Sequence, residues 1–271
     1  MVVKKKPRRR PTSRARLFNE RVEELSRRPQ FFRGIIYSEP GAGKSTLAAS
    51  SAKVGRTLIA NADRPDAHEY ARKLGYNPDI VDVANEKDIT EAWEWLRHEG
   101  HKEYDFFWLD SGTLFQESLM QENMEEVHRQ KEYRSIYLPD KPEYMLTQNQ
   151  LQVWVRRMRS VPISWGITAH MMSIVDEVDG DVKYMPSFQG GRGALSTKLC
   201  GYVGVVGRMY LKPVKIKKEG KTHTVNRRAL QVQPAGKFYA KDGFHALGNE
   251  IERPTMAQIM ELINTSTRSV K

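Results

Sequence analysis

A glycine-rich segment carries the clearest chemical pattern in this sequence of 271 residues. It reads Tyr37-Ser38-Glu39-Pro40-Gly41-Ala42-Gly43-Lys44-Ser45-Thr46, between an apolar stretch and a helix-forming one. In such a pattern, backbone N–H groups at a helix N-terminus surround phosphate groups, the lysine reaches the β and γ phosphates, and the next hydroxyl contacts Mg²⁺. The strict motif has glycine where this chain has Ser38. We predict that Ser38 to Thr46 hold the phosphates of ATP, with Ser45 also a magnesium ligand.

A carboxylate that could complete the metal site ends the apolar run Phe106-Phe107-Trp108-Leu109. This residue, Asp110, follows the glycine-rich segment at a distance that suits a second magnesium contact made through water. The plain alternative is an aspartate that ends a strand before a turn. We favour the magnesium role because the two patterns occur together.

Hydrolysis also needs a group that orients or deprotonates the attacking water. Asp63, just beyond the apolar run Thr57–Ala60, is our candidate, and Glu39 and Asp66 are alternatives. Short loops rich in aspartate also cap helices, so a capping role for Asp63 stays open. His170 ends a later apolar run, from which its side chain could sense the γ-phosphate; the alternative is an ordinary loop histidine.

Apolar and amphipathic segments alternate through the first two thirds of the chain, which predicts an α/β fold with a mostly parallel sheet flanked by helices. The expected strands are Phe31–Tyr37, Thr57–Ala60, Ile80–Val83, Tyr104–Leu109 and Val161–Ala169, and the expected helices are Thr46–Lys53, Ala67–Leu74, Ile89–His98, Leu114–Arg134 and Glu143–Arg159.

The later sequence predicts β-hairpins rather than further crossover units. Expected here are a hairpin of Ile174–Val178 with Val182–Met185, a loose loop over 187–193, strands Val203–Leu211 and Leu230–Gln233, a hairpin of Val214–Lys217 with Thr222–Val225, and a helix Met256–Ile263. We divide the chain into a disordered basic arm (1–16), a helical segment (17–30), an ATPase core (31–250) and a C-terminal helix and tail (251–271).

The charge of the chain is uneven. Its formal net charge is +11, and residues 1–16 contain eight Lys or Arg and no acid. Such a run favours a polyanion partner, with DNA or RNA phosphate the first candidate, although a solubilising tail is an alternative. No apolar run reaches the ~20 residues of a membrane span and no export signal is present, so we expect no membrane partner and a cytoplasmic protein. Cys200, the single cysteine, excludes an internal disulfide.

Over residues 31–250 the order of these motifs resembles the RecA-like recombinase core, and more closely the phage ATP-binding proteins that act as single-strand annealing proteins. Ala60-Asn61-Ala62-Asp63 resembles the segment with the catalytic acid, and Leu109-Asp110-Ser111 resembles the magnesium-site aspartate followed by serine. Gly190–Leu195 is similar to the exit of a mobile DNA-binding loop.

The resemblance implies roles for several further residues. His170 stands where the family has a polar switch residue, Lys183, Phe188 and Arg192 would contact DNA, and Lys241, or else Lys237, would reach the ATP of a neighbouring subunit. Two departures matter. Asp63 is one methylene shorter than the usual glutamate, and the DNA loop contains four acids that repel phosphate, namely Asp176, Glu177, Asp179 and Asp181.

The sequence therefore predicts an ATPase that binds Mg-ATP between subunits of a homo-oligomer and controls single-stranded DNA binding, annealing or strand exchange, with other recombination or replication proteins as further partners. DNA contact could also come from the basic arm, from Arg156, Arg157 and Arg159, or from Lys215, Lys217, Lys218 and Lys221. One alternative is a nucleotide or metabolite kinase with Arg129 and Arg134 in a lid. The other is an ATP-dependent scaffold or helicase loader.

Overall fold

The computed structural model describes residues 30–175, 180–218 and 221–269. The predicted basic arm and helical segment lie outside the described residues, apart from Gln30. Contacts separate the chain after Gln30, and the unit described below is Phe31–Lys271.

A central sheet organises this unit, and its middle is parallel. The strand order is β10-β8-β7-β1-β5-β4-β2-β3. Five neighbouring strands are parallel throughout, namely β1 (Arg33–Ser38), β5 (Ser164–Val175), β4 (Phe106–Asp110), β2 (Thr57–Asn61) and β3 (Asp79–Asp82). All residues of β2 and β4 are buried, as expected for strands covered on both faces, and this explains their unbroken apolar sequences.

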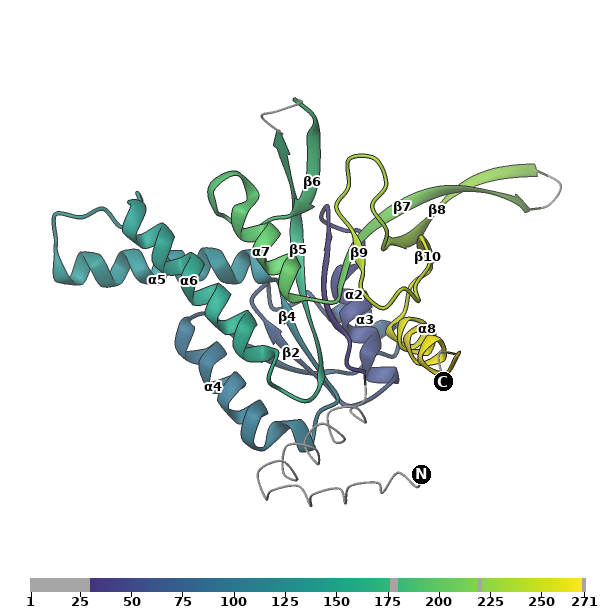
Figure 1. The fold of residues 1–271 in the computed structure, drawn as a ribbon, viewed down its shortest axis with the longest axis horizontal. Helices are drawn as coiled ribbons and strands as arrows, with labels where there is room; N and C mark the ends of the chain where they lie inside the picture. The colour runs from purple at the N-terminus through teal and green to yellow at the C-terminus, as the bar shows by residue number, and fades with distance from the viewer. Residues whose placement is uncertain (1–29, 176–179, 219–220, 270–271) are drawn as a thin grey trace, which may run out of the picture. The chain divides into compact units, whose positions relative to one another are not determined.

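Helices cover both faces, and alternate residues of each strand serve the two cores (Figure 1). Ile35 and Phe107 belong to one core, while the next residues along each strand, Ile36 and Trp108, belong to the other. The first core is covered by α4 (Glu86–His98), α5 (Gly112–Gln130), α6 (Lys141–Met158) and α7 (Ala194–Tyr202). The second is covered by α2 (Lys44–Ala49), α3 (Glu69–Lys73) and α8 (Met256–Ser269).

The antiparallel elements come late in the chain. β5 continues past the sheet and pairs with β6 (Val182–Pro186). β7 (Val205–Lys218) runs parallel to β1 at its start and then pairs with β8 (Lys221–Gln231) along its length. The short strands β9 (Lys241–Asp242) and β10 (Glu250–Glu252) pair with β7 and β8 respectively. The predicted α/β fold with a mostly parallel sheet, flanking helices and late hairpins is confirmed.

Several predicted segments differ from the structure; the strands expected over Val203–Leu211 and Val214–Lys217, for example, fall in one strand, β7, which begins at Val205. The helix expected over Thr46–Lys53 begins at Lys44 and becomes a 3-10 helix over Ser50–Lys53. The strand expected over Val161–Ala169 begins at Ser164 and continues through Val175 as β5. The helix α7 was not predicted, because the glycine-rich sequence before it suggested a loop; Gly193, with φ of 73°, starts this helix.

Candidate nucleotide-binding site

The glycine-rich segment forms a tight loop between β1 and α2. Gly41 and Gly43 have φ angles of 79° and 103°, in the left-handed region that favours glycine. A Cβ added at Gly43 would lie 2.6 Å from Nε of Arg228, so a larger residue here would also displace that side chain. The loop therefore presents backbone N–H groups at the start of a helix, which is the arrangement that binds phosphate.

Lys44 is folded back onto this loop. Its Nζ donates hydrogen bonds to the Ser38 hydroxyl at 3.0 Å, the Ser38 carbonyl at 3.3 Å and the Glu39 carbonyl at 3.4 Å. Burial lowers the pKa of Lys44, and the negative charge of Asp110 opposes this shift. The ammonium is thus held in a site that lacks a full counter-charge, and an anion bound in the loop would supply it.

Asp110 lies at the end of β4 and is 1% exposed. One carboxylate oxygen, Oδ1, accepts a hydrogen bond from the Thr168 hydroxyl on the neighbouring strand β5. The other, Oδ2, lies 3.5 Å from Nε2 of buried His68. Among the described residues, neither this oxygen nor either ring nitrogen of His68 has a hydrogen-bond partner. Burial lowers the pKa of His68, more than the nearby Asp110 raises it, so the ring is neutral near pH 7.

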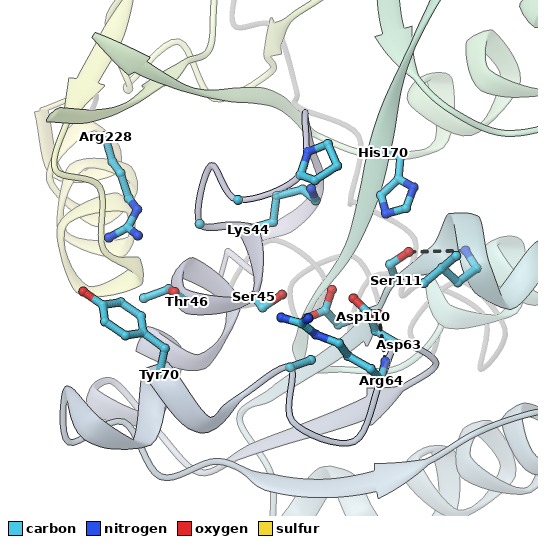
Figure 2. A pocket seen from close by; sticks show the side chains of 15 residues that line it. Lys44, Ser45, Thr46, Asp63, Arg64, Tyr70, Asp110, Ser111, His170 and Arg228 are labelled. Carbon is cyan, nitrogen blue, oxygen red and sulfur yellow. Dashed lines mark hydrogen bonds between the residues drawn. The ribbon is translucent and has the colours of Figure 1, made fainter. Parts of the chain in front are cut away.

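Asp63 lies beside these groups, and Figure 2 shows Ser45, Asp63 and Asp110 directed toward the same space. Asp63 accepts a hydrogen bond from the backbone N–H of Arg64 at 2.7 Å, which fixes one of its oxygens. Of the two alternatives for the water-orienting group, Asp66 pairs with Arg64 at 3.2 Å and Glu39 is exposed beside a different cavity. Asp63 is the one of the three that lines the cavity above the glycine-rich loop.

This cavity has a volume of about 430 Å³. The residues around it are Pro40, Gly41, Gly43, Lys44, Ser45, Thr46, Asp63, Arg64, Ala67, Tyr70, Asp110, Ser111, Leu114, His170 and Arg228. A second cavity of about 880 Å³ shares four of these residues, so the two adjoin along Gly43, Thr46, Tyr70 and Arg228. Of the predicted phosphate-binding residues, Ser38, Glu39 and Ala42 do not line the first cavity; Glu39 and Ala42 line a different one.

Two residues near the shared wall were not predicted. Tyr70 on α3 is 51% exposed and its ring faces the cavity, and the Arg228 guanidinium lies 5.6 Å from the centre of that ring. An exposed aromatic face beside a phosphate-binding loop can hold a nucleobase. The sequence offered no signal for this pair, because Tyr70 and Arg228 are brought together only by the fold.

His170 reaches the cavity from β5, as predicted, and Figure 2 shows its ring above Ser111. Its backbone N–H donates to the hydroxyl of Thr113 on α5 at 3.0 Å. The same hydroxyl donates to the Ser187 carbonyl at 2.8 Å, and the Ser187 N–H donates to the His170 carbonyl at 2.8 Å. These bonds join the end of the β5–β6 hairpin to the helix that follows Asp110.

The predicted contacts to DNA and to a neighbouring subunit differ in outcome. Phe188 is fully buried in the core, so its predicted role in base stacking is corrected: its ring packs under α5 and α7. Lys183 and Arg192 are exposed, which leaves their predicted role untested. Lys241 donates to the carbonyls of Cys200 and Val203 at 3.4 and 2.8 Å, at the end of α7. Asp176, Glu177 and Asp179 lie outside the described residues.

The residues around the cavity fit Mg-ATP. In the part of the chain that the structure describes, no group of three or more His, Cys, Asp or Glu side chains is placed to hold a metal by itself. A magnesium ion here would therefore take most of its ligands from phosphate and water, which is how this ion is bound beside nucleotides. Ser45 and the unpartnered oxygen of Asp110 are the protein groups that would hold it.

Comparison with known families agrees with this geometry. A family described as "AAA domain" matches residues 30–244. No curated protein matches the chain. Among the described residues, no helix has the length and apolar character needed to cross a membrane.

Proposed function

The chain belongs to the AAA domain family of P-loop ATPases, and we propose that it hydrolyses Mg-ATP to control its grip on single-stranded DNA. The family match supports nucleotide binding and hydrolysis. The observation that carries the proposed link to DNA is β5, a single strand that contributes Thr168 and His170 to the ATP site and then continues into the exposed hairpin with β6.

The proposed mechanism assigns one task to each residue around the cavity. Lys44 leaves the carbonyls of Ser38 and Glu39 and binds phosphate oxygens, where its charge stabilises the transferring phosphoryl group. Asp63, held by the Arg64 N–H, keeps a free oxygen for the attacking water. Mg²⁺, when bound, neutralises charge on the β and γ phosphates. Tyr70 and Arg228 form the end of the site that receives the base.

The nucleotide state would reach the hairpin by two routes. The first is β5 itself, through Thr168 on the carboxylate of Asp110 and through His170 in the cavity. The second is α5, where Gln116 exchanges two hydrogen bonds with the backbone of Gln189, at 2.7 and 2.8 Å. Loss of the γ-phosphate would change the contacts of His170 and so the position of the segment that carries Lys183 and Arg192.

We further propose a homo-oligomer in which a neighbouring subunit completes the site. In such an assembly a cation from the neighbour would help to balance the transition-state charge. Lys241 would have to leave the carbonyls at the end of α7 for this task, whereas Lys237 is exposed in the segment after β8. Lys237 is therefore the better candidate on structural grounds.

The kinase alternative has less support. Arg129 pairs with Glu126 at 2.5 Å, and Arg134 pairs with Asp140 and Glu143 at 2.7 and 2.9 Å. Neither arginine lines the cavity: Arg129 pairs within α5, and Arg134 joins the segment after α5 to the start of α6. The scaffold or helicase loader alternative shares the ATP site and differs only in lacking turnover.

The experiment that tests the proposal is the ATPase rate of the full chain with and without single-stranded DNA. We expect a slow basal rate that single-stranded DNA raises severalfold, and we expect Asp63→Asn to remove both rates while ATP binding persists. A rate that single-stranded DNA leaves unchanged would contradict the DNA-controlled ATPase. Nucleotide binding that changes the oligomer without any turnover would favour the scaffold.

A further inference from the structure

The β7–β8 hairpin continues beyond the sheet as a two-stranded ribbon, seen extending from the core in Figure 1. β7 pairs with β1 only up to Arg208, and β10 pairs with β8 only as far as Ala229. Beyond these points β7 and β8 pair only with each other, from Leu211 opposite Arg228 to Lys218 opposite Lys221. We call these residues, 211–218 and 221–228, the ribbon. At about 3.4 Å per residue it is roughly 27 Å long.

The ribbon is strongly basic. Its two strands contain five lysines, two arginines and no acidic residue. Lys212 is neutralised by Glu250 and Glu252 of β10, at 2.7 and 3.3 Å. Among the described residues, no acidic side chain lies within ion-pair distance of Lys215, Lys217 or Arg227. The ribbon therefore carries a positive charge that the rest of the described chain does not compensate.

The register of the ribbon divides its described basic residues between two faces. Lys212 is paired with Arg227 across the two strands, and Glu250 and Glu252 balance the charge of Lys212. The alternation of side chains also places Lys215 and Lys217 on one face, with exposed Thr222 and Thr224 opposite. This face is opposite to that of Lys212 and Arg227, and a polyanion lying along it would meet two ammonium groups and two hydroxyl groups.

We propose that the ribbon binds the phosphate backbone of duplex DNA. The major groove of B-DNA, about 12 Å wide, admits a two-stranded β-ribbon. Proteins that hold single strands combine positive charge with aromatic rings on which bases stack, and the ribbon contains no Phe, Tyr or Trp. Charge and hydroxyl groups without stacking rings are instead the groups that contact a duplex backbone. This site is separate from the β5–β6 hairpin, and its charge is present whether or not the chain hydrolyses ATP.

A simpler explanation of the lysines is protection of exposed strand edges, since charged side chains on an edge prevent pairing with other chains. That explanation predicts no change in DNA affinity when the charges are removed and predicts aggregation of the variants. The experiment must therefore compare variants that differ in position and not in the amount of charge that they lose.

The test measures binding of the full chain, without nucleotide, to a short fluorescein-labelled duplex and to a single strand of the same length, by anisotropy over a range of salt concentrations. The ribbon variant is Lys215→Gln with Lys217→Gln. The control is Lys102→Gln with Lys131→Gln, which removes the same charge from exposed positions at the ends of other elements. The control keeps the basic arm and its contribution to binding.

We expect the ribbon variant to bind duplex DNA about three- to tenfold more weakly than the wild type. The negative slope of the log of the association constant against log salt should become less steep by about two, one for each lost phosphate contact. The control should keep the wild-type slope. Equal losses in both variants would overturn the proposal, and so would a ribbon variant that loses single-strand affinity alone. Failure of DNA to stimulate the ATPase would instead contradict the proposed function and would leave this result standing.

Discussion

Replacement of Lys44 by methionine is expected to act in opposite directions on nucleotide binding and on stability. The methionine keeps the volume of the side chain and removes the charge. In the proposed complex the ammonium makes two charge-assisted hydrogen bonds to phosphate, each contributing about 1.5–3 kcal/mol. Their loss corresponds to about 3–6 kcal/mol, or roughly a 10²- to 10⁴-fold weaker affinity for ATP.

Thermal unfolding measures both effects in one assay. Ligand at 100 times its dissociation constant stabilises the folded state by about 2.7 kcal/mol. At roughly 2–4 °C per kcal/mol for a chain of this size, Mg-ATP should raise the wild-type Tm by about 5–11 °C. At the same ATP concentration, a 100-fold loss of affinity leaves about 0.4 kcal/mol, so the variant should shift by about 1 °C.

Without nucleotide the variant is expected to be at least as stable as the wild type. Burial lowers the pKa of Lys44 in the folded chain below its unfolded value, so the unfolded chain binds more protons. The charged lysine thus reduces stability at neutral pH, and this cost disappears as pH rises toward about 10.4, the unfolded pKa. The stability difference between the variant and the wild type should therefore narrow at alkaline pH.

Lys53→Met is the matched control, because Lys53 is exposed at the other end of the same helical segment. It should retain the full ATP-induced shift. The reasoning about Lys44 fails if Lys44→Met retains an ATP-induced shift close to that of the wild type. It also fails if the nucleotide-free variant melts several degrees below the wild type, since that would make the lysine a structural residue.

Three further predictions concern other parts of the molecule. Burial raises the pKa of the Cys200 thiol to about 12, so an aromatic disulfide reagent should modify the native chain very slowly. In denaturant the same reagent should modify one thiol per chain. Rapid labelling of the native chain would contradict the burial of Cys200. A Cβ at Gly166 would lie 2.2 Å from the indole of buried Trp108 in β4, so Gly166→Ala should lower the free energy of unfolding by about 1–3 kcal/mol. The control Gly201→Ala, at an open position in a helix, should raise the free energy of unfolding slightly. His68→Leu should raise the Mg²⁺ concentration needed for half-maximal ATPase activity several-fold, because Asp110 loses a neighbouring side chain. It should cost little stability, because the buried ring that is removed has no hydrogen-bond partner among the described residues. An unchanged Mg²⁺ requirement would limit His68 to a packing role.

The parallel core and the phosphate-binding loop could be predicted from the sequence because each has a local cause. Strands buried on both faces have unbroken apolar sequences, as in Phe106–Leu109, and the loop needs glycine at two left-handed positions. Asp63, Asp110 and His170 could be expected near the loop for a related reason, and all three line the cavity, while their roles stay predictions. Asp63 follows β2, Asp110 ends β4 and His170 lies in β5 opposite the end of β1, and the carboxyl ends of neighbouring parallel strands meet at one edge of the sheet.

The remaining features depend on contacts between distant segments, which local pattern does not contain. Phe188 was assigned to DNA because it lies in the segment that resembles a mobile DNA-binding loop, where an aromatic ring can stack on bases. In the structure the helix α7 brings it into the core, where a Cβ on Gly112 would lie 3.2 Å from its ring. His68 and Arg228 carry no sequence signal, since their roles follow from Asp110 and from Gly43, which lie far away in the chain.

The two projecting hairpins are each continuous with a strand that reaches the ATP site, and they reach it at opposite ends. β5 contributes Thr168 and His170 beside Asp110, where the γ-phosphate would lie. β8 contributes Arg228 beside Tyr70, at the end proposed for the base. Affinity for single-stranded DNA should therefore differ between ADP and a non-hydrolysable ATP analogue.

Duplex affinity at the ribbon should respond differently, because in the proposed complex Arg228 would contact the part of the nucleotide that ADP and ATP share. It should change between the nucleotide-free chain and either nucleotide, and it should be equal for ADP and the ATP analogue. The same anisotropy assay measures both affinities, and Arg228→Gln should remove the response of duplex binding alone. A duplex affinity that follows the γ-phosphate would show instead that the two hairpins move as one body, since the contacts of His170 would then control both.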